Sequence, residues 1–395
     1  MCLPASGPCS NKQVVSPLSE GETTAWFPPP FSPIRKKQVV PSGEISHLPR
    51  HAPSSSGIIS CPEFDLALTL RSGQVFRWRE GLSPQGSVPL FTGWISGSPA
   101  AVSQESSRLL LEGVSPEAAR RFFALDVDLA AVTRQIDADP VIHEALRCYP
   151  GLRVVRQDPW ECAVSFMLSA YNNIPRLTAM IEQLSGKFGA AVPLPRDGEA
   201  GPGTSAAALA WFPPGRPSPL LFRPERESAA RIERRPTGWG RPSGDRPASP
   251  ERGMARLRSF PRPEALARAS ERALRACGLG YRAPYLKGMA RAVVSGTVDL
   301  EKLRDLEDEE LRQELLAFPG VGEKVVECVM LFAYGRAAAF PVDVWIGRAM
   351  RGWYFRRRKV SDEKIREFAR KHFGPYCGWA QQVLYCFARW HPEDS

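Results

Sequence analysis

The side chains best suited to covalent chemistry lie on either side of a short glycine-containing turn. Lys324 falls in the first turn of a predicted helix over residues 323–334, where the positive end of the helix dipole disfavours a protonated amine. A free amine is the form that makes a Schiff base. Asp343 ends the extended segment Phe340-Pro-Val-Asp343. Lys324 and Asp343 together would suit a reaction in which the amine attacks a sugar carbon and the carboxylate stabilises the charge that develops there. The alternative is a solvated lysine and an aspartate that caps the next helix, and Asp343 can do both.

The turn itself, Pro319-Gly-Val-Gly322, follows a helix-like run over residues 311–318. Gly320 and Gly322 permit a tight turn with positive φ that leaves backbone N–H groups exposed at a helix N-terminus. These groups, with Val321 between the glycines, can bind a phosphate without regard to base. The pattern predicts a helix-hairpin-helix that clamps a DNA backbone, although an ordinary helical turn can have the same P-G-x-G sequence.

Two pairs of residues share helix faces. Cys328 lies four residues after Lys324, and Gln381 and Tyr385 stand in the same relation on the last predicted helix. An amide beside an aromatic ring suits a planar base, which needs hydrogen bonds at its edge and stacking on its face. Cys328 and Tyr385 are equally compatible with a role in the core.

These residues belong to a longer series of motifs, and the series resembles the helix-hairpin-helix-GPD superfamily of DNA glycosylases. Within it the chain is similar to the 8-oxoguanine DNA glycosylases of the long, eukaryotic-like type. The likeness covers about residues 60–190 and 258–390, with the motifs in the family's order. Besides the hairpin they are Ser72-Gly-Gln-Val-Phe-Arg-Trp-Arg79, Phe122-Phe-Ala-Leu-Asp126, Arg156-Gln-Asp-Pro-Trp-Glu161, Ser169-Ala-Tyr-Asn-Asn-Ile-Pro-Arg176, Gly278-Leu-Gly-Tyr-Arg-Ala283 and Gly374-Pro-Tyr-Cys-Gly-Trp-Ala-Gln381.

The resemblance implies a bifunctional enzyme that rotates a base out of the duplex before removing it. The lysine at the position of Lys324 would attack the sugar C1′, expel 8-oxoguanine and form a Schiff base, from which β-elimination nicks the abasic site. Asp343 would stabilise the developing sugar cation. The expected partner is double-stranded DNA containing oxidised guanine, bound by a monomer. No metal and no small-molecule cofactor is implied.

The resemblance also assigns the residues that would recognise the damaged base. Cys328 and Tyr385 would hold the base between them, and Gln381 would read its Watson–Crick edge. The carbonyl of Gly73 would accept a hydrogen bond from N7–H of 8-oxoguanine. Undamaged guanine has an acceptor at N7, so this contact could discriminate by about 1–3 kcal/mol, the cost of an unmet buried polar group.

A second group of residues would recognise the partner strand. Arg176 and Arg282 match the arginines that grip the estranged cytosine, and Tyr281 matches the wedge that fills the vacated space, so excision opposite cytosine is expected. Tyr171 stands where most relatives have asparagine, and its ring could occupy the gap by stacking. Trp345 replaces a histidine that lies near a phosphate in well-known relatives.

Two other functions fit parts of the sequence. A non-catalytic helix-hairpin-helix DNA-binding protein would need the hairpin, but it has no need of Lys324, Asp343, Gln381 and Gly73 together. A glycosylase for other oxidised or alkylated purines would share the fold. Enzymes for alkylated bases work without the lysine nucleophile, so Lys324 argues against that alternative.

The elements that must position these residues change type along the chain. Strand-like patterns come first and helical periodicity follows, which is typical of an α+β fold. We expect a small antiparallel β domain over residues 58–128, with strands at 64–70, 88–95 and 107–111. Ser115 is the expected N-cap of the first helix after the sheet, and further helices are predicted at 140–147, 161–171 and 174–188.

The mainly α-helical helix-hairpin-helix glycosylase body is expected to come in two parts. Residues 129–190 would form the first part, and residues 259–395 the second part, with the hairpin and the catalytic residues. Residues 1–57 and the Pro/Arg-rich stretch 191–258 lack apolar periodicity and are predicted to be a disordered extension and a disordered insertion.

Composition narrows the class of protein further. The chain has 395 residues, 43% of them hydrophobic and 24% charged, which is typical of a soluble protein of two or three domains. A net charge of +10 favours a polyanionic partner. No apolar run is long enough for a membrane span, and nine scattered cysteines without a C-x-x-C pair argue against a zinc or iron–sulfur site. We expect an intracellular protein, at the nucleoid of a bacterium or in a eukaryotic nucleus.

Overall fold

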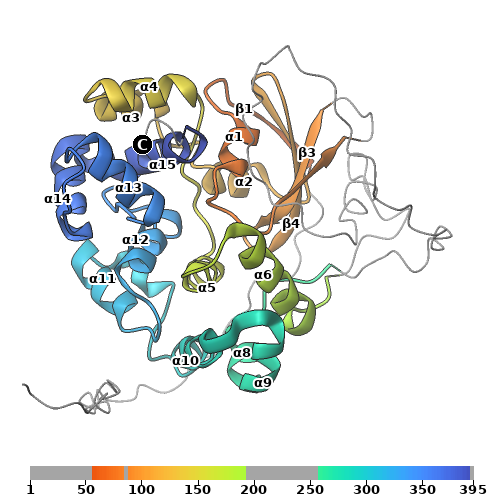
Figure 1. Cartoon of the computed structure of the whole chain (residues 1–395). Helices are drawn as coiled ribbons and strands as arrows, with labels where there is room; N and C mark the ends of the chain where they lie inside the picture. The colour runs from red at the N-terminus through yellow and green to blue at the C-terminus, as the bar shows by residue number, and fades with distance from the viewer. Residues whose placement is uncertain (1–55, 84–87, 193–256, 392–395) are drawn as a thin grey trace, which may run out of the picture. The chain divides into compact units, whose positions relative to one another are not determined.

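The structure, a computed structural model, describes residues 56–83, 88–192 and 257–391 (Figure 1). All of them belong to the unit His51–Ser395. An antiparallel sheet comes first and a predominantly helical body follows, which confirms the expected α+β class. The predicted disordered extension and insertion lie almost entirely outside the described residues.

The sheet has five antiparallel strands in the order β1-β5-β4-β3-β2. They are β1 (Ser56–Ser60), β2 (Arg79–Leu82), β3 (Pro89–Ile95), β4 (Ser98–Glu105) and β5 (Arg108–Glu112). Trp78 packs so closely against Gly93 of β3 that a Cβ there would lie 2.2 Å from the indole. Phe122 and Phe123 extend this aromatic contact, with ring centroids 5.7 and 6.1 Å from that of Trp78. One face of the sheet is thus closed by the residues that lead into the helical body.

The prediction of a strand over residues 64–70 was wrong, because this segment contains helix α1 (Leu66–Arg71). Asp65 caps the helix by accepting a hydrogen bond from the Leu68 N–H at 2.7 Å. The helix lies between two cores: Leu66 and Leu70 pack in the core of the sheet domain, and Leu68 packs in that of the helical body. Burial on two sides spaces apolar residues two apart, and this spacing imitates the alternation of a strand.

The helical body is built from helices of mostly 6 to 15 residues. The helices that follow the sheet are α2 (Pro116–Phe122), α3 (Leu129–Ile136), α4 (Pro140–Cys148), α5 (Pro159–Ser169), α6 (Ile174–Phe188), α8 (Pro263–Arg268), α9 (Glu271–Leu274), α10 (Ala283–Val294), α11 (Asp308–Leu316), α12 (Glu323–Phe332), α13 (Val344–Trp353), α14 (Asp362–Phe373) and α15 (Cys377–Trp390). A π-helical turn, η2 (Arg275–Leu279), and a 3-10 turn, η3 (Gly280–Arg282), join α9 to α10.

Local capping signals explain where several helices begin. The hydroxyl of Ser115 accepts from the Ala118 N–H, as predicted for the cap of α2. Helix α6 has the predicted bounds, and α4 ends one residue later than expected. Helix α5 begins two residues early, because Asp158 caps it by accepting from the Glu161 N–H at 2.9 Å.

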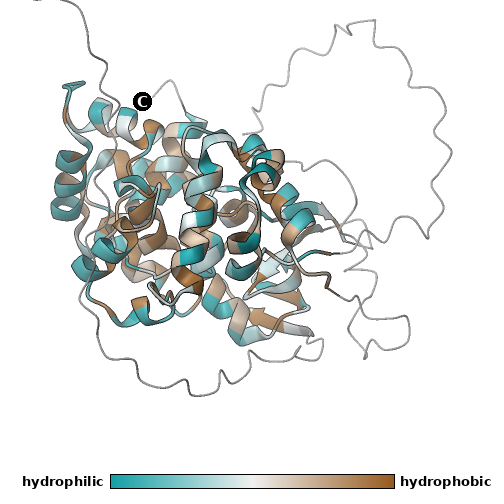
Figure 2. Ribbon diagram, turned by 90° about the horizontal axis from the view of Figure 1, so that it is seen from below, coloured by the Kyte–Doolittle hydropathy of each residue, from teal (hydrophilic) through white to brown (hydrophobic). Residues whose placement is uncertain are grey.

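Helices α5 and α12 form the centre of the body. Nearly every residue of α5 is buried, and its Phe166 stacks on Phe332 of α12 with ring centroids 5.3 Å apart. Figure 2 shows hydrophobic colour gathered on the inward faces of the surrounding helices and hydrophilic colour on their outer faces. Among the helices that the structure describes, none has both the length and the hydropathy needed to cross a membrane.

Candidate active site

The hairpin between α11 and α12 leaves the N-terminus of α12 open. Gly320 has φ +77°, and a Cβ at this position would lie 2.7 Å from the ring of Tyr285 on α10, so only glycine fits. Gly322 does not have the positive φ that the sequence suggested. Its φ is −112°, and apart from its chain neighbours no atom of the described residues lies within 4 Å of the position of its Cβ. No side chain of the described residues caps α12, so the N–H groups of its first turn can accept an anion.

Lys324 lies in the first turn of α12 and packs against α5. Its Nζ donates a hydrogen bond to Oγ of Ser169 at 3.0 Å and lies 5.2 Å from the centroid of the Phe166 ring. The Ser169 hydroxyl donates in turn to the carbonyl of Phe166 at 2.6 Å. The hydroxyl proton is thus directed away from the lysine, and an oxygen lone pair faces the lysine nitrogen. Ser169 lies within one of the sequence motifs, but nothing in its spacing indicated this contact.

Asp343 is the N-cap of α13, as predicted, and accepts from the Ile346 N–H at 2.8 Å. Burial raises the pKa of its carboxyl group, while this hydrogen bond and the charge of Lys324 oppose the rise. The carboxylate and the lysine therefore act on each other electrostatically within one site. Capping and participation in this site do not exclude one another.

Cys328 lies one turn after Lys324 and is buried. Burial raises the pKa of its thiol to about 11, although the charge of Lys324 opposes the rise. The group is a neutral thiol at pH 7 and presents a small apolar surface beside the lysine.

Gly73 faces helix α15 across this site. It follows α1 with φ +84°, and a Cβ there would lie 3.4 Å from both Cε1 and the hydroxyl of Tyr385. Gln381, one turn before Tyr385, is only 4% exposed, and its Oε1 has no hydrogen-bond partner among the described residues. The ring of Tyr385 thus lies against the Gly73 backbone, and the Gln381 amide, whose oxygen is unpaired among the described residues, stands one helical turn away on α15.

The turn that carries Gly73 is held from both sides by glutamines. Gln382 of α15 donates to the Ser72 carbonyl at 3.0 Å. Gln74 donates to Oγ of Ser72 and to the carbonyl of Arg153, both at 2.8 Å, and accepts from the Val155 N–H at 2.9 Å. Three of these bonds join residues 79 or more positions apart and could not be predicted from local spacing, and together they hold the Gly73 backbone opposite Tyr385.

Arg389 is a charged neighbour of the site that the sequence analysis did not identify. Its guanidinium donates to the hydroxyl of Tyr385 at 2.6 Å. Burial raises the pKa of Asp343 and raises that of Tyr385 to about 12, and the charge of Arg389 opposes both rises. Arg389 stands four residues after Tyr385 on α15, so the spacing that linked Gln381 to Tyr385 would have found it.

The residues expected to read the partner strand come from the start of α6 with the loop before it, and from η3, and Arg282 joins these two parts. The guanidinium of Arg282 donates to the carbonyl of Ala170, next to Tyr171, and lies 4.3 Å from the ring centroid of Tyr281. Tyr171 is 96% exposed and has φ +54°, and Tyr281 is 55% exposed. Arg176 is also exposed, on the first turn of α6. Arg282 itself is 5% exposed, so its side chain faces the protein while the other three face solvent.

Trp345, at the position of the expected histidine, is half-buried in the first turn of α13. The guanidinium of Arg348 lies 5.7 Å from its ring centroid.

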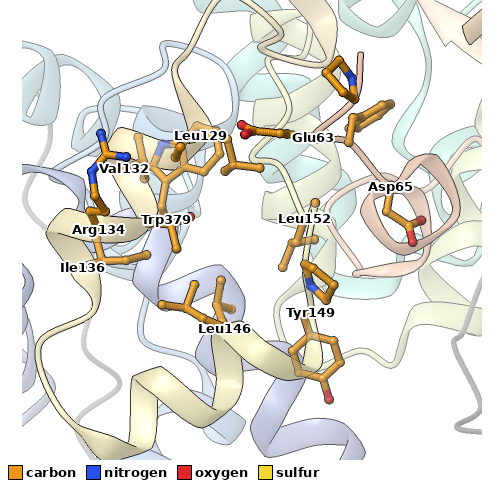
Figure 3. A pocket seen from close by; sticks show the side chains of 17 residues that line it. Glu63, Asp65, Leu129, Val132, Arg134, Ile136, Leu146, Tyr149, Leu152 and Trp379 are labelled. Carbon is orange, nitrogen blue, oxygen red and sulfur yellow. The ribbon is translucent and has the colours of Figure 1, made fainter. Parts of the chain in front are cut away.

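A hollow in the described part of the chain lies away from this site (Figure 3). It has a volume of about 640 Å³ and contains none of the residues named above for the site. Side chains of α3, α4 and α15, among them Leu129, Leu146 and Trp379, line it together with Glu63 and Asp65. Trp379 and Val383 reach it from α15, whereas Gln381 and Tyr385 lie at the site.

Comparison with known proteins identifies relatives over most of the chain. Residues 58–163 match the family "8-oxoguanine DNA glycosylase, N-terminal domain", and residues 248–375 match the "HhH-GPD superfamily base excision DNA repair protein" family. The N-glycosylase/DNA lyase OGG1 of Arabidopsis thaliana is 26% identical over 97% of this chain and 88% of its own length. The N-glycosylase/DNA lyase of Saccharomyces cerevisiae is 26% identical over 83% of this chain and 84% of its own.

A solved structure shows the same arrangement of elements. The 8-oxoguanine glycosylase/lyase of Clostridium acetobutylicum, in complex with double-stranded DNA containing cytosine opposite 8-oxoguanine, superposes with a TM-score of 0.63. It is 26% identical, and the match covers 85% of this chain and 98% of that one.

Proposed function

Because the chain belongs to the HhH-GPD superfamily of base-excision DNA repair proteins and carries the N-terminal domain of the 8-oxoguanine DNA glycosylases, we propose that it is a bifunctional DNA glycosylase and abasic-site lyase. It acts on duplex DNA and removes 8-oxoguanine. One observation carries the proposal: the charge of the lysine in the first turn of α12 acts on the half-buried carboxylate that caps α13.

Lys324 is the nucleophile of the proposed reaction. The ammonium group first gives up a proton to solvent. The lone pair of the resulting amine forms a bond to the sugar C1′ while the bond from C1′ to the base breaks, and the base leaves with that electron pair and takes up a proton. The carboxylate of Asp343 stabilises the positive charge that develops on the sugar. Opening of the sugar ring then leaves a protonated imine. Loss of a C2′ proton expels the 3′-phosphate and nicks the strand, and water releases the lysine.

The damaged base is held between Cys328 and Tyr385 in this proposal. Gln381 reads its Watson–Crick edge, and the free Oε1 of this buried amide supports the assignment. The Gly73 carbonyl accepts the N7 hydrogen that distinguishes 8-oxoguanine from guanine. Every step is assigned to side chains or backbone of this chain, so the proposal calls for no cofactor.

The rest of the duplex is gripped on both strands. The open N-terminus of α12, with Gly320, Val321 and Gly322, binds a phosphate of the backbone. Tyr281 fills the space that the flipped base leaves. Arg176, Arg282 and Tyr171 contact the partner base, which we propose is cytosine.

The protein acts as a monomer in this proposal, since one chain supplies all of the assigned groups. Its site of action is the chromosome, at the nucleoid of a bacterium or in a eukaryotic nucleus.

Borohydride trapping tests the chemistry and the partner base together. Duplexes with one 8-oxoguanine opposite each of the four bases are incubated with the protein and reduced, and the covalent adduct is measured. We expect an adduct that is strongest opposite cytosine and absent with Lys324→Gln, which still binds the duplex.

Two results would contradict parts of the proposal. An equal yield of adduct opposite every base would support the imine chemistry but contradict the proposed preference for cytosine. Tight binding without any adduct or excision would leave a non-catalytic DNA-binding protein. Duplexes with a ring-opened or alkylated purine, assayed in parallel, would reveal a different preferred base.

A further inference from the structure

Glu327 is a fully buried carboxylate on α12, three residues after Lys324. Its Oε1 faces guanidinium groups from two other helices: it lies 2.5 Å from Arg312 of α11, 2.9 Å from Arg370 of α14 and 3.9 Å from Arg366 of α14. Such a cluster needs an explanation, because buried ion pairs are often no more stabilising than well-packed apolar residues of similar volume.

The second oxygen of Glu327 holds the segment that leads to the Asp343 carboxylate. Oε2 accepts a hydrogen bond from the backbone N–H of Phe340 at 2.6 Å. The side chain of Phe340 is itself fully buried, and Asp343 caps α13 three residues later. A single side chain thus connects the helix of the lysine to the short segment that delivers the aspartate.

The start of the same loop is held by α15. The Gly378 N–H donates to the carbonyl of Ala337 at 2.8 Å, and the thiol of Cys377 donates to the carbonyl of Ala338 at 3.2 Å. A Cβ on Gly378 would lie 2.5 Å from the carbonyl oxygen of Ala339. The loop between α12 and α13 (residues 333–343) is therefore held by α15 at residues 337 and 338 and by Glu327 at Phe340.

We propose that Glu327 is a positioning residue, which sets the distance and orientation between the Lys324 amine and the Asp343 carboxylate. The three arginines hold its carboxylate in place, and the carboxylate holds the Phe340 backbone. This inference rests on the proposed function, because it assigns Glu327 an effect on catalysis that passes only through Asp343.

A double-mutant cycle tests this route. Glu327→Gln, Asp343→Asn and the double variant are compared with wild type in single-turnover excision of 8-oxoguanine from a duplex, with enzyme in excess. A displacement of about 1 Å can cost roughly 100-fold in rate, so we expect Glu327→Gln to lose about 10- to 100-fold. In the Asp343→Asn background the same change should cost less than about twofold, because coupled residues are not additive.

A second readout separates positioning from general loss of structure. Borohydride trapping at a preformed abasic site needs Lys324 but no departure of a base, so Glu327→Gln should retain trapping there within about threefold while excision falls. Glu363→Gln is the matched control. Glu363 pairs with the same Arg366 and Arg370, but its side chain is 53% exposed, and the hydrogen bonds found for it do not reach the loop. It should excise at the wild-type rate.

Independent, multiplying losses from Glu327→Gln and Asp343→Asn, or equal losses in excision and trapping, would overturn the inference. Glu327→Asp, which keeps the charge but shortens the reach to Phe340, must show the same dependence on Asp343 and serves if the glutamine variant does not fold. Failure of the proposed function gives a different result: Lys324→Gln and Asp343→Asn would then excise like wild type.

Discussion

Replacement of Gly73 by alanine tests whether the space between this glycine and α15 holds the damaged base. The φ of +84° lies in the left-handed region. The new methyl group would stand 3.4 Å from the ring and hydroxyl of Tyr385 and 3.5 Å from Cδ1 of Ile174, which is close but not forbidden contact. The variant should therefore fold, with the methyl group directed at the Tyr385 ring.

Two separate free-energy changes are expected from Gly73→Ala. The left-handed conformation costs an alanine about 1–2 kcal/mol of folding stability, which corresponds to a decrease in Tm of roughly 1–2 °C per kcal/mol in a protein of this size. In the site, the methyl group keeps the base from the Gly73 carbonyl. Loss of one such hydrogen bond, about 1–3 kcal/mol, should slow excision of 8-oxoguanine by roughly 5- to 150-fold.

Gly97 provides the matched control for the backbone effect. It has φ +75° in the turn between β3 and β4, and within the described part of the chain only its own neighbours in sequence come within 4 Å of the position of its Cβ. Gly97→Ala should lower the Tm about as much as Gly73→Ala and leave excision unchanged. Thermal unfolding and single-turnover excision on the same preparations measure both quantities.

The reasoning would be refuted if Gly73→Ala excised 8-oxoguanine as fast as Gly97→Ala. The base would then not approach the Gly73 backbone. Tyr385 would have only a role in the core, which is the alternative that the sequence left open. A much larger loss of stability in Gly73→Ala than in Gly97→Ala would show that the Tyr385 ring cannot move to accept the methyl group.

Three further predictions concern single contacts. Burial raises the pKa of Asp343 and the charge of Arg389 opposes this rise, so Arg389→Met should raise that pKa further and shift the acidic limb of the pH–rate profile to higher pH. Arg389→Lys keeps the charge and should shift the limb less. An unchanged pH profile in Arg389→Met would contradict the assignment. Asp65→Ala removes the acceptor for the Leu68 N–H and should lower the free energy of unfolding by about 0.5–2 kcal/mol, as urea denaturation would measure. An unchanged free energy of unfolding would show that the cap does not stabilise the protein. Cys328, with a thiol pKa of about 11, should resist iodoacetamide at pH 7 in the folded protein, as peptide mass spectrometry would detect; rapid modification would show a reactive thiolate.

Features that depend on a few neighbouring residues could be predicted from the sequence. The caps at Ser115 and Asp343 follow from side chains that bond N–H groups two or three residues away. Helix α6 was predicted with its observed bounds, because Asn173, Pro175 and a regular apolar face mark it locally. The hairpin glycines belong to the same class, although only Gly320 adopts the positive φ.

Helix α1 shows where local pattern reading fails. Its leucines alternate because one side packs on the sheet and the other on the helical body, and that arrangement exists only after the two cores have come together. Period-two spacing then has two physical causes, and the sequence alone does not separate them.

The sequence by itself determined which chemical groups this protein has and on which helix turns they stand: the amine of Lys324, the capping carboxylate of Asp343, and the amide and ring of Gln381 and Tyr385. Only the tertiary structure decided what these groups touch. The hydroxyl of Ser169 is 155 positions from Lys324, and the Ser72 carbonyl is 310 positions from Gln382. Contacts at such separations depend on how whole helices pack, because helical periodicity fixes which face of a helix is apolar but not which neighbour that face meets.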